Sequence, residues 1–297
     1  MPLTLNEKQR YHHIPRFLYI LVIYILSVHS LQSQQAPSGI NYKPPQFIIE
    51  AAGSFELPVG NAYGHMADFF TFKNYGLVHG VGFHFNLKYG VNKKANLYPF
   101  ISFGFAQLQN NDFGIAFIDS NNISNGYPLK GPLTYSSTPG SSILMLRDIF
   151  AGLGLQYIFF PKKPVMPFVG LELDYNYLWG YYIQTPNTAV GPNPGDQETF
   201  SINSTSRLGI GAEAGFDYRI SQNLGFVFGT RFKFANLLGK KSEYTQPAYI
   251  NPGSRNKINL LDQASTDLNT NLDKSRNITY LEFYLGFTLF IGKIIIH

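Results

Sequence analysis

The chain has 297 residues, a formal net charge of +5 and no cysteine, which excludes disulfides, thiolate metal sites and a lipidated N-terminal cysteine. Lysine and arginine are scattered, so the basic balance does not indicate a nucleic-acid partner. Beyond the N-terminal segment there is no apolar run of about eighteen residues, and transmembrane helices are not expected. A mean hydropathy of −0.08 with 16% aromatic residues suits strands that are apolar on one face only.

The first 33 residues have the pattern of a secretory signal peptide. Three basic residues precede an apolar run at 17–26, and a polar segment at 27–33 follows. The run is too short for a membrane helix, although a retained membrane anchor is the alternative interpretation. Residues 34–45 are rich in proline and are expected to form a periplasmic linker.

Residues 278–291 carry the clearest strand pattern in the chain. Large apolar side chains occupy alternate positions, and small or polar residues such as Glu282, Gly286 and Thr288 stand between them. A strand of about fourteen residues, tilted by roughly 45°, is long enough to cross the hydrocarbon of a bilayer.

Seven earlier stretches repeat this alternation of large apolar residues with glycine or polar residues. They cover residues 46–55, 76–89, 97–108, 147–159, 166–178, 205–219 and 224–236. Together with the last strand they make an even number of strands, as bacterial outer-membrane barrels require.

The connections between these strands alternate between long and short. The short ones are residues 91–96, 160–165 and 220–223, whereas the polar stretches 109–146, 179–204 and 237–277 are long. Outer-membrane barrels have this asymmetry, with long loops outside the cell and short turns in the periplasm. We therefore predict that residues 46–297 form an all-β, transmembrane, antiparallel up-and-down barrel of eight strands in the bacterial outer membrane. A soluble eight-stranded barrel is the alternative, but it would need a polar exterior.

The eight amphipathic strands, the N-terminal leader and the final Leu-Gly-Phe-Thr-Leu-Phe-Ile-Gly-Lys together identify a family likeness. The chain resembles the small outer-membrane β-barrels of the OmpA/OmpX superfamily, in the form common in Bacteroidetes-like bacteria. The likeness covers residues 46–293 and rests on patterns instead of signature residues. One departure is the ending Lys-Ile-Ile-Ile-His, where an aromatic residue is usual, so the assembly signal is expected near Phe287 and Phe290. No peptidoglycan-binding domain is expected.

The alternation predicts which charged residues point into the lumen. The predicted network comprises Glu50, Lys88, Glu172, Asp174, Glu213, Arg231, Lys233 and Glu282. Glu213, Arg231 and Glu282 fall near mid-height of neighbouring strands and are expected to form a Glu-Arg-Glu cluster, because unpaired buried charges are costly. The network is interpreted as a structural salt-bridge plug; a gate or ion path is the alternative.

Aromatic residues near the strand ends predict two girdles at the membrane interfaces, where amphipathic rings prefer to lie. The predicted members are Tyr75, Tyr89, Tyr98, Tyr157, Tyr175, Tyr177, Trp179 and Tyr218. The centres of the strands carry phenylalanine and leucine instead.

No catalytic residue, metal site or cofactor is predicted. The histidines lack metal-ligand spacing, and the carboxylates of Glu172 and Asp174 are expected to be neutralised by luminal cations. Some barrels of this size modify lipids, and His79 faces lipid near the outer rim, but it has no nucleophile on its strand face.

The function predicted from sequence is a structural or surface-binding role through the long external loops, because binding residues concentrate on loops above a rigid scaffold. A narrow pore for ions or small solutes is the alternative, and a lipid-modifying enzyme is the third possibility. The expected partners are outer-membrane lipid and lipopolysaccharide, the barrel-assembly machinery and an extracellular ligand of the loops. The barrel is expected to be a monomer that binds no nucleic acid.

Overall fold

The structure is a computed structural model, which describes residues 42–70, 73–92, 95–119, 135–186, 197–241, 257–258, 260–264 and 274–292. The predicted signal peptide and residues 34–41 of the predicted linker lie outside these ranges. Within them, no helix has the length and apolar character needed to cross a membrane.

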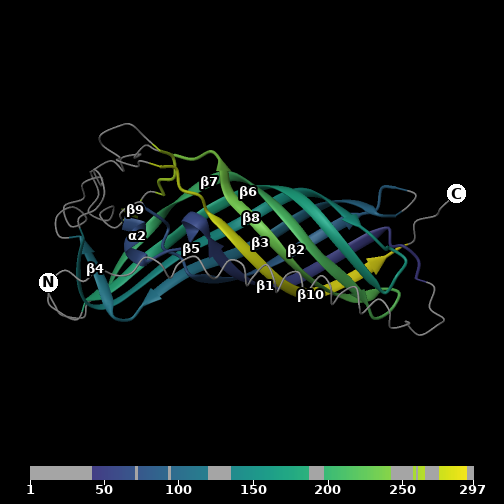
Figure 1. Cartoon of the computed structure of the whole chain (residues 1–297), viewed down its shortest axis with the longest axis horizontal. Helices are drawn as coiled ribbons and strands as arrows, with labels where there is room; N and C mark the ends of the chain where they lie inside the picture. The colour runs from purple at the N-terminus through teal and green to yellow at the C-terminus, as the bar shows by residue number, and fades with distance from the viewer. Residues whose placement is uncertain are drawn as a thin grey trace, which may run out of the picture. The chain divides into compact units, whose positions relative to one another are not determined.

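Eight long antiparallel strands of the described chain form a closed ring, in which they run obliquely and side by side (Figure 1). They are β1 (Phe47–Val59), β2 (His79–Tyr89), β3 (Leu97–Asp112), β5 (Tyr135–Ile158), β6 (Val165–Pro186), β7 (Glu198–Arg219), β8 (Leu224–Leu238) and β10 (Thr279–Ile291). Each strand pairs with the next around the ring, and β1 pairs with β10 to close it. The predicted eight-stranded up-and-down barrel is confirmed.

Four shorter elements lie outside the ring pairing or in its connections. They are η2 (Gly60–Ala62), α2 (Met66–Phe70), β4 (Ile115–Asp119), which pairs antiparallel with the first residues of β5, and β9 (Lys257–Ile258), which runs parallel to β7. Figure 1 shows α2, β4 and β9 at one end of the barrel. We call this the long-loop end, and the opposite end, with the connections 90–96, 159–164 and 220–223, the short-turn end.

Several strands are longer at the long-loop end than the sequence predicted. Residues 135–146 belong to β5, and the predicted loop 179–204 contributes 179–186 to β6 and 198–204 to β7. Beyond the bilayer the outward face need not be apolar, so these strand extensions resemble loops in composition. Strand β2, in contrast, begins at His79 instead of residue 76, because Gly76 has a φ of +69° that interrupts the extended backbone.

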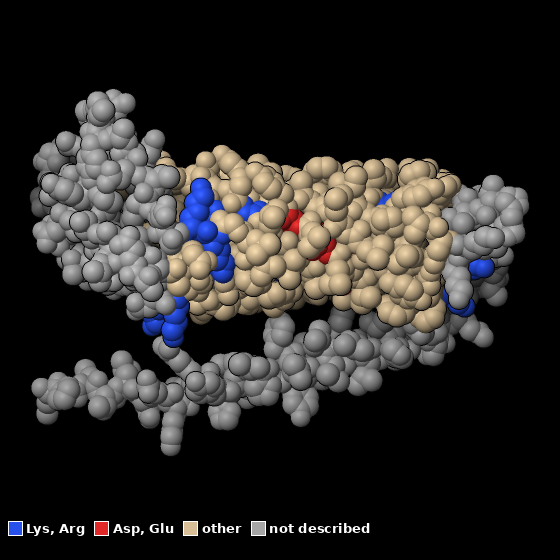
Figure 2. Space-filling view, turned by 90° about the horizontal axis from the view of Figure 1, so that it is seen from above, with Lys and Arg blue, Asp and Glu red and all other residues tan. Residues whose placement is uncertain are grey.

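The outward side chains form an apolar belt around the barrel. Leu153, Leu171 and Leu173 are 67–69% exposed, whereas Asp148, Glu172 and Asp174 of the same strands are buried on the inner face. In Figure 2 the middle of the wall is mostly free of Lys, Arg, Asp and Glu. A soluble barrel has apolar side chains inside and polar side chains outside, and here the arrangement is the opposite. The soluble barrel is therefore excluded, because an exposed apolar belt of this size needs lipid around it.

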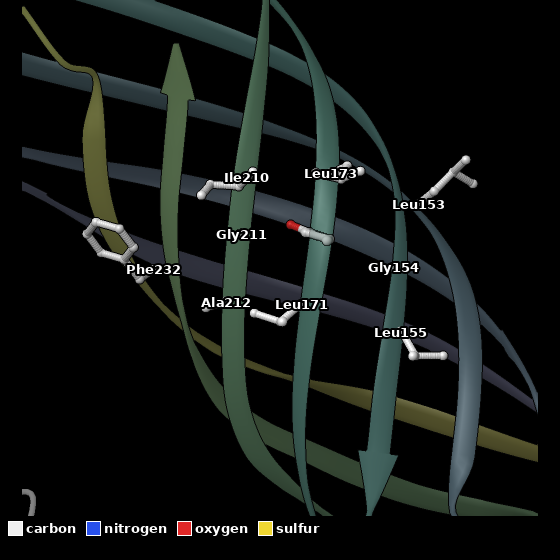
Figure 3. Close-up of a pocket in the computed structure, with 10 residues that line it drawn as sticks. Leu153, Gly154, Leu155, Leu171, Leu173, Ile210, Gly211, Ala212 and Phe232 are labelled. Carbon is white, nitrogen blue, oxygen red and sulfur yellow. The ribbon is translucent and has the colours of Figure 1, made fainter. Parts of the chain in front are cut away.

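The belt is indented where small residues replace large ones. A hollow of about 520 Å³ lies over Gly154, Gly211 and Ala212, and leucines of β5 and β6 border it together with Ile210 and Phe232 (Figure 3). Its lining is mostly apolar, and Glu172 is the charged residue among those that line it. Gly211 is required on the inner side as well, because a Cβ there would meet the side chain of Glu172 at 2.7 Å.

Leu173→Arg is expected to destabilise the folded barrel by about 2–4 kcal/mol, because it places a charge near the middle of the belt. Urea unfolding of the barrel in lipid vesicles measures this. Ser201→Arg, outward on β7 at the long-loop end, is the matched control and should change the unfolding free energy by about 0–1 kcal/mol. Equal effects of the two substitutions would contradict the position assigned to the belt.

Candidate functional site: the closed lumen

Arg231 occupies the centre of the lumen and is surrounded by three carboxylates. Its Nη2 lies 3.1 Å from Glu213 Oε2, its Nη1 3.5 Å from Glu282 Oε2 and its Nε 3.5 Å from Glu172 Oε1. Glu213 and Glu282 stand directly opposite Arg231 on β7 and β10, and Glu172 reaches it from β6 across Gly211. The structure thus places the predicted Glu-Arg-Glu cluster together and adds a third carboxylate to it.

A second group of charges is centred on Glu50 of β1. Lys88 Nζ donates to Glu50 Oε2 at 2.5 Å, and Asn86 Nδ2 donates to Oε1 at 2.9 Å. The ring of His84 lies between Glu50, at 3.0 Å, and Glu282, at 2.6 Å. His84 therefore joins the Glu50 group to the Arg231 group, so the two form one network across β1, β2 and β10.

The remaining luminal charges are paired more loosely. Lys233 Nζ is 3.6 Å from Asp174 Oδ2, which completes the predicted set of eight residues inside the barrel. Three further buried carboxylates accept hydrogen bonds from hydroxyl groups: Glu56 from Ser54, Asp148 from Tyr280 and Asp217 from Thr288. Within the described part of the chain, these three have no cationic partner within 4.0 Å.

Aromatic rings cover the luminal cations from the side. Lys233 lies over Phe150, Lys88 over Phe168 and Arg231 beside Tyr284. Each ring face is electron-rich and attracts a cation more strongly in a water-poor interior. Charges and rings together fill the cross-section, as expected for a barrel of eight strands.

Some buried polar atoms in the lumen have no hydrogen-bond partner among the described residues. They include both oxygens of Asp174, both oxygens of Glu172 and the hydroxyl of Ser102. Buried polar groups of this kind are normally satisfied by ordered water. These atoms are therefore the positions in the lumen where an ordered water would be expected to bind.

The long-loop end of the lumen is closed by residues 260–262, which fold inward. Asp262 receives two hydrogen bonds of 2.8 Å from Arg207, from Nε and Nη2, and one of 2.9 Å from Asn236. The backbone N–H of Lys241 donates to the same carboxylate at 2.7 Å. Asp262 and Arg207 are buried, so this bidentate pair holds the inward segment firmly.

Arg276 fixes the first connection beneath the same cap. Its guanidinium donates to the carbonyl oxygens of Leu261, at 2.5 and 3.2 Å, and Asn74, at 3.1 Å, and it lies 4.5 Å from the centre of the Tyr75 ring. Burial raises the pKa of Tyr75, so its hydroxyl stays protonated. Around these groups an apolar cluster that includes Met66, Leu260 and leucines of β3, β5 and β6 excludes water.

The short-turn end is occupied by residues 42–45. The carbonyl oxygen of Lys43 accepts a hydrogen bond of 2.9 Å from Arg219, and that of Pro45 accepts one of 2.8 Å from Tyr98. Tyr42 is buried, and the Arg219 guanidinium lies between its ring and that of Phe290. The predicted domain boundary at residue 46 is thus a few residues late, because this part of the predicted linker packs against the barrel.

Two predicted members of the aromatic girdles are wrong. Tyr75 is buried under the cap, and Tyr98 points into the lumen with the same strand parity as Ser102. Proximity to a strand end is a weaker signal than strand parity. The other members lie on the outer face: Tyr89, Tyr157, Tyr175, Tyr177 and Tyr218 are 41–51% exposed, and Trp179 is half-buried.

His79 does not gather catalytic partners in the described residues. Its ring Nε2 lies 3.0 Å from the side-chain nitrogen of Gln109 on β3. No group of three or more His, Asp or Glu residues there is arranged to hold a metal ion.

Sequence reasoning missed the cap at the long-loop end. The parity of β7 indicates that Arg207 points inward, but nothing in the sequence marks Asp262, 55 residues later in a polar connection, as its partner. An inward arginine without a strand partner is the signal that could have prompted a search among the loop carboxylates.

No protein-family model and no curated protein matches the chain. Among solved structures, it is similar to Neisserial surface protein A, with 13% identity, a TM-score of 0.41, and coverage of 83% of this chain and 97% of that chain. It is also similar to the outer membrane protein OprG from Pseudomonas aeruginosa, with 10% identity, a TM-score of 0.39, and coverage of 85% and 99%. The outer membrane protease OmpT from Escherichia coli gives 9% identity, a TM-score of 0.35, and coverage of 86% and 98%.

At these identities and TM-scores the placement of the chain rests on its own geometry. A closed antiparallel ring, an outward apolar belt with aromatic residues at its edges and a polar interior are the features of bacterial outer-membrane barrels. The chain is a β-barrel protein of the bacterial outer membrane.

Arg231→Met is expected to destabilise the barrel by about 3–5 kcal/mol, because the carboxylates of Glu172 and Glu213 lose the cation that pairs with them. Adding Glu213→Gln should recover more stability than adding Glu282→Gln, since Glu282 retains His84 as a partner. Urea unfolding in vesicles measures all four proteins. Lys162→Met, which removes an exposed charge, is the control. A single mutant as stable as the wild type would show that the cluster does not support the barrel.

Asp262→Ala is expected to loosen the cap while leaving the barrel folded, because buried Arg207 loses its bidentate partner. Hydrogen exchange should become faster at residues 260–264, with protection of the β6 and β10 amides unchanged. Gln263→Ala, an exposed neighbour, is the control. Unchanged exchange at residues 260–264 in Asp262→Ala would mean that the cap is held by its apolar contacts alone.

Proposed function

We propose that the protein acts as a closed, non-enzymatic barrel that presents its long external loops to a ligand at the cell surface. The observation that carries this proposal is the closure of the lumen at three levels: the Asp262 cap, the Arg231 network and the segment 42–45. A lumen filled in this way does not let solutes through, and the barrel serves as a rigid scaffold for the loops. The loops are then the part of the chain available for binding. We also propose that the long loops lie outside the cell and that the chain is a member of the OmpA/OmpX superfamily.

The second candidate is a narrow pore. The oxygens of Glu172 and Asp174, which accept no hydrogen bond from the described residues, and the hydroxyl of Ser102 favour it, because ordered water normally satisfies such buried groups. A pore would require both ends to open. The lipid-modifying alternative rests on His79 alone, whose contact is the amide of Gln109, a group that cannot act as a base.

Single-channel recording of the folded barrel in planar bilayers separates the first two candidates. The closed barrel is expected to show no stepwise ion conductance in the wild type. Asp262→Ala combined with Arg231→Met and deletion of residues 42–45, which removes all three closures, is the opened control. Stepwise conductance of the wild type would replace the surface-binding proposal by the pore.

Deletion of residues 120–134, 187–196 and 242–256 tests the role of the loops. Folding should be spared, because strand pairing and the lipid-facing area stabilise the barrel, and the heat-sensitive gel mobility of the barrel should remain. The phenotype of a null strain should not be restored by this variant. Full restoration would contradict a surface-binding role of the loops.

A further inference from the structure

Arg147 is a cation on the outer face of the barrel wall. It lies on β5 with the same parity as Ile149 and Leu153, which belong to the apolar belt. Within the described part of the chain no carboxylate lies within 4.0 Å of it, in contrast to Arg207 and Arg231. A charge at the edge of hydrocarbon without a counter-charge from the protein requires one from the surroundings.

The position of Arg147 coincides with the boundary of the belt. It stands directly opposite Gln107 on β3 and Trp179 on β6, whereas the next outward row towards the short-turn end is Phe105, Ile149 and Tyr177. Tyr157, at the other edge of the belt, is ten positions further along β5, which at the tilt of a barrel strand is about 25 Å of height. Arg147 therefore lies at the level where lipid headgroups begin.

The guanidinium of Arg147 is held in place by neutral groups. Its Nε donates to Gln107 Oε1 at 3.0 Å, and its Nη2 lies 3.4 Å from the Tyr181 hydroxyl and 3.6 Å from Met145 Sδ. Gln107 in turn donates to Gln109 Oε1 at 3.4 Å. None of these contacts neutralises the charge, and Nη1 makes no hydrogen bond to the described residues. An oriented guanidinium of this kind binds phosphate oxygens well.

A hollow in the wall lies between β6 and β7, on the far side of Trp179 and Tyr181 from Arg147, which does not itself line it. It has a volume of about 570 Å³, and its lining combines aromatic rings with hydroxyl and amide groups: Tyr177, Trp179, Tyr181, Thr199, Ser201 and Asn203. Trp179 and Tyr181 thus border both the cation and the hollow. Aromatic faces with hydroxyl and amide groups suit a sugar, which offers C–H faces and hydroxyl groups, better than the small headgroup of a phospholipid.

From these observations we propose that Arg147 and the adjoining hollow form a binding site for a phosphorylated glycolipid of the outer leaflet, with the phosphate on Arg147 and a sugar ring against Trp179 and Tyr181. The lipid chains would continue along the apolar belt below. The site lies on the outer wall and involves neither the loops nor the lumen, so it stands apart from the proposed surface-binding role. Its place in the outer leaflet rests on the proposed orientation, with the long loops outside the cell.

Native mass spectrometry of the full chain, folded and released from vesicles, tests the site. The vesicles contain phosphatidylcholine with an acylated glucosamine disaccharide that either carries or lacks phosphate. The wild type is expected to retain the phosphorylated form, and Arg147→Gln to retain about tenfold less, as one charge-assisted contact is lost. Arg147→Lys should be intermediate. Lys162→Gln with Lys163→Gln, at the short-turn end, removes more charge and should retain as much as the wild type.

Equal retention of the phosphorylated and dephosphorylated forms by the wild type would overturn the proposal without need of any variant. Equal retention by wild type and Arg147→Gln, confirmed as folded by its heat-sensitive gel mobility, would overturn it as well. Displacement of the glycolipid by an equal amount of phosphatidylglycerol would show a general anion contact and would also refute the assigned ligand.

Discussion

Hydrocarbon offers no hydrogen-bond partner to a peptide group, so a strand can remain in the membrane only if both of its edges are paired. In this barrel the pairing of β1 with β10 meets that requirement. All 13 residues of β1 stand in register with β10 on one side, and ten of them with β2 on the other. The rest of the structure depends on this closure, because an eight-stranded ring has a fixed and narrow interior.

The narrow interior explains the density of charge within it. Alternation turns every second side chain inward, and the outward positions must be apolar, so the polar residues of eight strands share one small volume. The charges of Lys88, Arg231 and Lys233 are tolerated because each of these cations has a carboxylate on one side and an aromatic ring on another. Glycines such as Gly229, which faces the Tyr284 ring, leave the room that these large groups require.

The sequence predicted those parts of the structure in which the two faces of a strand must differ, and it did not predict the parts without such a requirement. Alternation at period two identified all eight ring strands and the inward face of Glu213, Arg231 and Glu282, because the bilayer enforces a strict difference between the two faces. It failed at the long-loop end, where β6 and β7 continue beyond the bilayer without that difference. The contacts of Asp262 and Arg276 join segments far apart in the chain through irregular backbone, and such contacts leave no period to detect.

Residues 42–45 also bear on the order in which the barrel can be completed. The partner of Lys43 is Arg219, 176 positions later, and Phe290 closes the same contact from the last strand. Loop closure over such a distance costs conformational entropy that pairing of the strands between has already removed, so we expect the first described residues to settle after those strands. The segment can make these contacts only in a ring that has closed in this register, because Arg219 on β7 and Phe290 on β10 must both be in place.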